Sequence, residues 1–107
     1  MRVELTEAIW FEEHAVTLAE LAQLCELPVS LLEELISADA IVPLEQVSSE
    51  PRFGAQALAT ARTASRLRTD FDLDSPGLLL ALSLLDRVHD LERQVRALRA
   101  RSPGIIR

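Results

Sequence analysis

Few side chains in this sequence have the types and spacing that catalysis or metal binding requires. His14, His89 and Cys25 are far apart and show none of the short ligand spacings of a metal site. The adjacent glutamate pairs 12–13 and 33–34 would point to different faces of a helix, so neither pair directs two carboxylates at one bond. Three glycines in total could hardly build a phosphate-binding loop, and no nucleophile motif is present. We therefore expect no catalytic residue, no metal site and no cofactor, and predict that the protein is not an enzyme.

Charge is distributed very unevenly along the chain. Residues 1–51 carry eleven acidic side chains and one basic side chain, Arg2, which amounts to −10, whereas residues 52–107 carry ten arginines and six acidic side chains, or +4. An acidic half of this kind would attract a cationic protein surface and repel phosphates. The alternative is that these carboxylates only form a solvated surface. We expect the protein to act by binding another macromolecule, and a protein rather than DNA.

Length and composition indicate one helical domain over residues 1–107. The chain is rich in Ala and Leu, has no Tyr and contains only four Phe or Trp residues. The single cysteine cannot form an internal disulfide, and no signal-peptide pattern is found at the start. The longest apolar run, residues 78–85, is too short to span a bilayer. We predict an all-α cytoplasmic protein without a membrane segment.

Two short amphipathic helices are predicted in the acidic half. Thr17 and Glu20 have the spacing of a capping box at the start of a helix over residues 18–25. Ser30 can cap a second helix over residues 31–38, whose leucines and isoleucine recur on one face. The connection between the two helices is about as short as in a helix-turn-helix, which holds the second helix across the first.

The segments around these two helices are predicted as follows. Residues 1–16 form an N-terminal extension, in which residues 3–6 alternate between apolar and polar like a short strand. Residues 41–53 contain two prolines between β-prone pieces and are typical of a small hairpin or wing. A third helix follows Gly54, and its shared apolar face consists of Leu58, Ala61, Ala64, Leu67 and Phe71.

The last predicted helix covers residues 75–101, with Ser75 as its cap and Pro76 at its first position. Its apolar side chains recur at alternating spacings of three and four residues, the a/d pattern of a coiled coil. This seam consists of Ala81 and of five residues that we predict to form a homodimer interface: Leu84, Val88, Leu91, Val95 and Leu98. The alternative is that the whole seam packs within the chain, against the preceding helix.

Several short segments together resemble a known family. Thr17-Leu-Ala-Glu-Leu-Ala22, the turn Pro28-Val-Ser30, Ile41-Val-Pro43 and Arg52-Phe53 resemble the winged helix-turn-helix of MerR-type regulators, which bind DNA. The second half is similar to the CbpM chaperone-modulator subfamily of these proteins. That similarity is carried by Arg66-Leu-Arg68, Asp70-Phe-Asp-Leu-Asp74, Pro76-Gly77, Leu80-Ala-Leu82, Leu84-Leu-Asp86 and the stretch from Leu91 to Arg99.

The resemblance implies an adaptor that binds the J-domain of the DnaJ-like co-chaperone CbpA and restrains its stimulation of the DnaK ATPase. A MerR-type DNA-binding regulator is the alternative. The residues favour the adaptor, because the segment that would read DNA contains two glutamates where cations are expected. J-domains characteristically present a basic helix to an acidic surface of DnaK, so an acidic surface here could compete for the same face. The residues that we predict to contact the partner are Glu26, Leu31, Glu33, Glu34 and Asp39.

Overall fold

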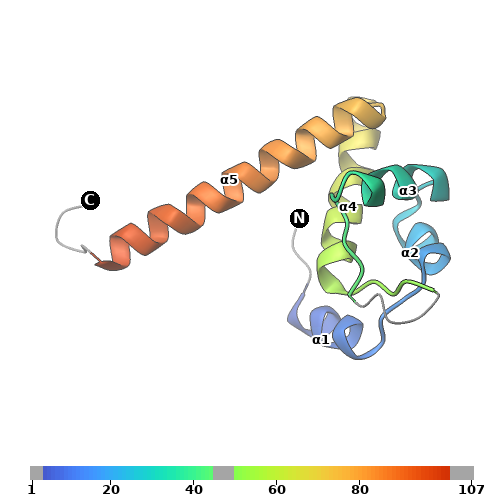
Figure 1. Ribbon diagram of the computed structural model, residues 1–107, viewed down its shortest axis with the longest axis horizontal. Coiled ribbons are helices and arrows are strands. Elements are labelled where there is room, and N and C mark those ends of the chain that lie inside the picture. Colours follow the sequence, from blue (N-terminus) through green and yellow to red (C-terminus); the bar gives the residue numbers. More distant parts are fainter. Residues whose placement is uncertain (1–3, 45–49, 102–107) are drawn as a thin grey trace.

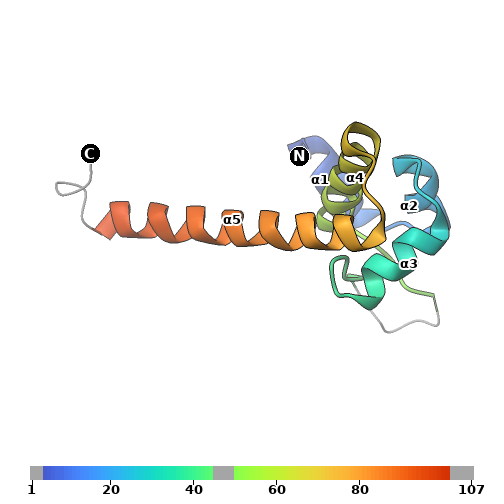
Figure 2. The ribbon, with the colours of Figure 1, turned by 90° about the horizontal axis from the view of Figure 1, so that it is seen from above.

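The computed structural model describes residues 4–44 and 50–101, and in these parts all regular structure is helical. Five helices follow one another here: α1 (Leu5–Glu13), α2 (Leu18–Cys25), α3 (Val29–Ser37), α4 (Ala55–Phe71) and α5 (Ser75–Arg101). The first four helices form a body, and α5 extends away from it as a straight arm (Figure 1, Figure 2). The predicted all-α fold, a helix-turn-helix followed by one helix and a long C-terminal helix, is confirmed.

Helix α2 begins at the predicted residue because its capping box is formed. The hydroxyl oxygen of Thr17 accepts a hydrogen bond from the backbone N–H of Glu20 at 3.2 Å. In return, the backbone N–H of Thr17 donates to Oε1 of Glu20 at 2.9 Å. The helix ends at Glu26, which adopts the left-handed conformation with φ of 55°. The start of this helix therefore follows from a signal in the sequence, and its last residue, Cys25, agrees with the predicted range.

Helix α3 begins at Val29, two residues before the predicted start at residue 31. The ring of Pro28 holds its φ at −62°, and its carbonyl accepts hydrogen bonds from the N–H groups of Leu31 and Leu32 at 3.1 and 3.2 Å. Pro28 thus occupies the cap position, and the prediction that Ser30 caps this helix is wrong. Ser30 lies inside the first turn instead.

Helix α1 replaces the short strand predicted for residues 3–6. Residue 3 lies outside the described residues, and residues 5–13 are helical. A helix places Phe11 in the core, where only 7% of its surface is exposed, while Leu5 remains largely exposed. An alternation over four residues is too short to specify a strand against this burial.

Helix α1 is attached to α4 by an ion pair between residues distant in sequence. The two terminal nitrogens of the Arg62 guanidinium, Nη1 and Nη2, donate to the carboxylate of Glu7 at 3.1 and 2.8 Å, and both side chains are about one-third exposed. These hydrogen bonds lower the pKa of Glu7 from its usual 4.5 and raise the pKa of Arg62. Helix α1 is therefore held on the body by this pair and by the buried Phe11.

We expect Glu7→Gln to loosen α1. The pKa of Glu7 is depressed in the folded state, so the pair stabilises docking above the ordinary carboxyl pKa and is lost as the pH falls through the lowered value. At neutral pH the α1 amides of the variant should exchange roughly a few-fold faster, because the partly exposed pair is a modest contact. In an acid titration, the fluorescence of Trp10 should show a transition below pH 4.5 that the variant lacks.

The control for this prediction is Glu12→Gln, on the same helix and exposed. It removes the same charge without touching Arg62. If Glu12→Gln accelerated α1 exchange as much as Glu7→Gln, general charge rather than the pair would hold α1.

The predicted wing at residues 41–53 lies partly outside the described residues, since these exclude 45–49. Its two flanks approach each other, because the N–H of Leu44 donates to the carbonyl of Arg52 at 2.8 Å. Phe53 then forms an isolated antiparallel bridge with Val16, with hydrogen bonds of 2.8 and 2.9 Å in both directions. This bridge joins the loop to the segment between α1 and α2.

The core lies where α4 meets its neighbours. α4 packs against α1, α2 and α5, and α3 packs against α2 and α5. Small buried side chains on α4 allow these helices to approach closely. The largest fully buried side chains come from α2 to α5 and from the segment between α3 and α4: Phe53, Leu21, Leu32, Leu35, Ile41, Leu58 and Leu78.

The predicted apolar face of α4 is correct except at its end. Leu58, Ala61 and Ala64 are buried, and Leu67 packs against the core. Phe71, however, is 67% exposed, so its assignment to the core face is wrong. It is the last residue of α4, where the chain turns through the left-handed Asp72, and no other helix of the described residues covers it.

Helix α5 contacts the body only through its first turns. Leu78 and Leu82 are buried, whereas every residue from Asp86 to Arg101 is exposed. The side-chain acceptor at its start is Asp74, whose Oδ1 accepts from the N–H of Gly77 at 3.0 Å, so the prediction of Ser75 as cap is wrong. Within residues 4–44 and 50–101, no helix combines the length and the hydropathy needed to cross a membrane.

Candidate protein-binding surface

Four of the five residues predicted to contact a partner are exposed on or beside α3. Glu33 and Glu34 lie in the middle of that helix, and Glu26 and Asp39 lie in the turns before and after it. Leu31, in contrast, is only 7% exposed. A partner could contact Leu31 only by inserting a group into the cavity that this side chain lines.

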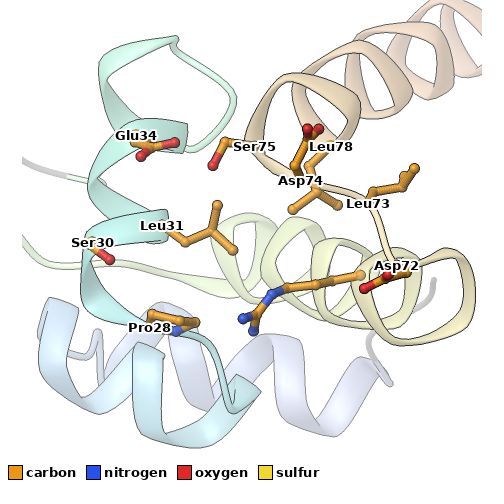
Figure 3. Close-up of a pocket in the computed structure, with 10 residues that line it drawn as sticks. Pro28, Ser30, Leu31, Glu34, Asp72, Leu73, Asp74, Ser75 and Leu78 are labelled. Atoms are coloured by element: carbon orange, nitrogen blue, oxygen red, sulfur yellow. The ribbon is translucent and has the colours of Figure 1, made fainter.

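Such a cavity, of about 550 Å³, separates α3 from the turn between α4 and α5 (Figure 3). Leu31 and Glu34 line its α3 side, with Pro28 and Ser30. The opposite side comes from a segment some forty residues further along the chain: Arg68, Asp72, Leu73, Asp74, Ser75 and Leu78. Figure 3 shows that Leu31 and Leu78 extend toward each other between these two sides.

The charges around this cavity are mainly negative. Glu34, Asp72 and Asp74 contribute three carboxylates, and Arg68 is the one basic residue in its lining. A cavity with this lining favours a cationic group from a partner over a phosphate. The two aspartates were not predicted as contact residues from the sequence, where they belong to the segment Asp70-Phe-Asp-Leu-Asp74 that carries the resemblance to CbpM. The sequence feature that could have indicated them is the repeat of aspartate at every second residue, 70, 72 and 74, just before Ser75-Pro76.

Asp39 does not belong to this cavity. It lines a second hollow, of about 340 Å³, at the other end of α3, where Glu12 from α1 and Asp86 from α5 also contribute. Apolar side chains of the following loop, from Ile41 to Leu44, complete that hollow. Glu26 and Glu33 line neither of the two. The structure therefore divides the predicted contact residues between two acidic hollows and the exposed surface of α3.

The seam of α5 is not covered by the rest of the described chain. Between 43% and 57% of the surface of each side chain is exposed in the predicted interface residues Leu84, Val88, Leu91, Val95 and Leu98. A different face of the helix, with Leu78 and Leu82, contacts the body. Packing of the whole seam within the chain, the alternative considered from the sequence, is therefore wrong.

Comparison with known proteins gives two kinds of similarity. A family described as MerR HTH family regulatory protein matches residues 16–100, which include α2 to α4 and most of α5. Chaperone modulatory protein CbpM of Coxiella burnetii is 29% identical over 79 residues, 74% of each chain. Chaperone modulatory protein CbpM of Salmonella paratyphi B is 33% identical over 67 residues, 63% of this chain and 66% of the relative. Helix α1 precedes the segment matched by the family.

Proposed function

Because the chain belongs to the MerR helix-turn-helix family of regulatory proteins, and within it resembles the CbpM chaperone modulators, we propose that it modulates a chaperone by binding a protein. The partner is the J-domain of a DnaJ-like co-chaperone of the CbpA type, and binding inhibits the co-chaperone's stimulation of DnaK. The observation that carries this proposal is the acidic surface of α3 and its cavity, with Glu33 and Glu34 exposed and Asp72 and Asp74 opposite.

The second candidate function is DNA binding, for which the family match is the reason. In a helix-turn-helix protein the second helix enters the major groove, and cations nearby neutralise phosphates. Here α3 carries no Lys or Arg, and its exposed glutamates would be repelled by phosphates. The same charges would attract the basic helix of a J-domain. The charge of α3 thus supports protein binding over DNA binding.

We also propose that the modulator is a homodimer held by the α5 seam. A stripe of five half-exposed Leu and Val side chains on a projecting helix is a large uncovered apolar surface. The a/d spacing of these residues suits pairing with the same helix of a second copy. A dimer would leave the acidic surface of α3 available in each protomer, because α3 contributes nothing to the seam.

Adding the purified protein to its cognate co-chaperone and DnaK should lower the stimulated ATPase rate toward the DnaK basal rate. The double variant Glu33→Gln, Glu34→Gln should bind the J-domain more weakly, by roughly three- to tenfold at low salt, with a smaller salt dependence. The reason is that complementary charge acts largely on the association rate. Surface plasmon resonance or stopped-flow fluorescence at several salt concentrations measures the association and dissociation rates.

The matched control is Asp70→Asn with Asp90→Asn, two exposed carboxylates on α4 and α5 that line none of the hollows described and give the same change of charge. If both double variants slowed association equally, only the net charge would matter and α3 would not be the contact. Undiminished ATPase stimulation at saturating protein would contradict the J-domain proposal. Steeply salt-dependent retention on duplex DNA would favour the second candidate.

A further inference from the structure

A separate hollow lies at the junction of α1 and α2. It has a volume of about 420 Å³ and is lined by Trp10, Val16, Glu20, Gln23 and Leu24. None of these residues lines the cavity beside α3. Trp10 is 48% exposed and Leu24 is 56% exposed, so two large apolar side chains remain partly uncovered at its walls. We call this hollow the α1–α2 groove.

Two further large apolar side chains are exposed on α1, outside the lining of the groove. Ile9 and Leu5, one and two turns from the groove end of the helix, are 52% and 77% exposed. Residues four apart lie on one face of a helix, so these two side chains form a stripe beside Trp10. Several large apolar side chains exposed on one short helix of a small protein are typical of an interaction site.

The groove wall formed by α1 is held in place. The ring of Trp10 stacks on His14 with centroids 4.7 Å apart and meets the edge of Phe11 at 4.9 Å. Phe11 is buried, and the Glu7–Arg62 pair holds the same helix to α4. A partner would therefore meet a preformed wall, which lowers the entropic cost of binding.

Two carboxylates lie in and beside the groove. Glu20 lines it, and its pKa is lowered by hydrogen bonds from the backbone and the hydroxyl of Thr17 and, to a lesser extent, by the charge of the nearby Arg52, so this carboxylate stays ionised at neutral pH. Glu13 is exposed one turn after Trp10 on α1. No Lys or Arg is among the lining residues. An apolar groove with acidic neighbours complements a partner that carries apolar and cationic side chains together.

We propose that the α1–α2 groove docks a cationic amphipathic helix of a partner protein. One large apolar side chain of that helix inserts between Trp10 and Leu24, a second lies along Ile9, and Lys or Arg side chains flank Glu20 and Glu13. An amphipathic helix presents anchors at such spacings. Its α1 wall, with Trp10, precedes residues 16–100, so this part of the surface lies outside the segment matched by the family, and the groove is separate from the proposed contact at α3.

Trp10 makes the proposal directly measurable, since it is the sole tryptophan of the chain. The probe is a synthetic amphipathic helix of Leu and Lys, about five turns long. Adding it to the full chain should shift the emission of Trp10 to shorter wavelength, saturably, and added salt should weaken the binding. Leu24→Gln should reduce the affinity roughly tenfold, as expected for an anchor contact.

Two matched variants separate this site from other surfaces. Leu80→Gln makes the same change at a 63% exposed leucine on α5 and should leave the affinity unchanged. Glu33→Gln with Glu34→Gln, which tests the contact at α3, should also leave it unchanged. Circular dichroism of each variant should match that of the parent protein, because the replaced side chains are exposed.

Three results would overturn the proposal. A peptide with Glu in place of Lys that bound equally well would show that cations are not recognised. Equal weakening by Leu24→Gln and Leu80→Gln would place the peptide elsewhere. An emission shift that followed the protein's own concentration without peptide, and that Leu24→Gln abolished, would make a second copy the occupant instead of a partner protein.

Discussion

Replacing Leu91 and Leu98 together by Glu should convert the protein from a dimer to a monomer while leaving most of its helix content intact. Both leucines lie on the exposed seam of α5, at 49% and 54% exposure. Burying Leu91, Val95 and Leu98 between subunits would contribute about 1.5–3 kcal/mol for each fully buried side chain, before the costs of association. A glutamate at either position would place a charge without a partner in that interface. Light scattering at several concentrations measures the change.

A double variant on the outer side of the same helix provides the control. Ala97→Glu with Ala100→Glu adds the same two charges at exposed positions outside the a/d seam, so it should remain dimeric. If this control variant were also monomeric, repulsion between the added charges on the two α5 helices would explain both results. An unmodified protein that was already monomeric at high micromolar concentration would contradict the dimer outright, and the distal part of α5 would then be left for the partner to cover.

Replacing Phe53 by Ala should lower the free energy of unfolding by about 3–5 kcal/mol. Phe53 is fully buried, and its backbone forms the bridge to Val16 that joins the two loops of the body. Removing its ring leaves a cavity that close-packed neighbours fill only in part. Because a small domain has only about 5–15 kcal/mol of total stability, a large fraction would be lost. Urea denaturation at fixed protein concentration measures the difference.

Phe71→Ala is the matched control. It also tests whether Phe71 is buried, as the sequence pattern predicts, or exposed, as in the structure. The sequence pattern places Phe71 on the core face, whereas the structure leaves it 67% exposed. With exposure of this extent we expect a loss of less than about 1 kcal/mol. A loss as large as that of Phe53→Ala would show that Phe71 is buried in solution, within the chain or against a second copy.

The start of α2 and the range of α5 follow from local signals, so both could be predicted from the sequence without any tertiary contact. The reciprocal hydrogen bonds of Thr17 and Glu20 span three residues, so their pattern is visible without any tertiary contact. The position of the long helix over 75–101 was also predicted. Two residues, Ser30 and Pro28, could each begin α3. The helix begins directly after Pro28, because the ring of proline fixes the backbone angle that a cap position needs.

The acidic nature of the candidate site was likewise contained in the sequence, because net charge does not depend on how the helices pack. Glu33 and Glu34 are exposed as an acidic binding surface requires. Leu31 is not, since the helix periodicity that predicts an apolar face cannot state which part of that face the body will cover. For the same reason Phe71 was predicted on the core face of α4, although it is exposed.

Only the tertiary structure decided which distant residues lie together. Arg62 meets Glu7 across 55 residues, and Asp72 and Asp74 face Glu34 across the cavity beside α3. It also decided that Leu78 and Leu82, rather than the a/d seam, attach α5 to the body. Such contacts depend on which helix faces meet and at what angle, and ridges and grooves of several helices set these jointly. No local spacing in the chain contains that information.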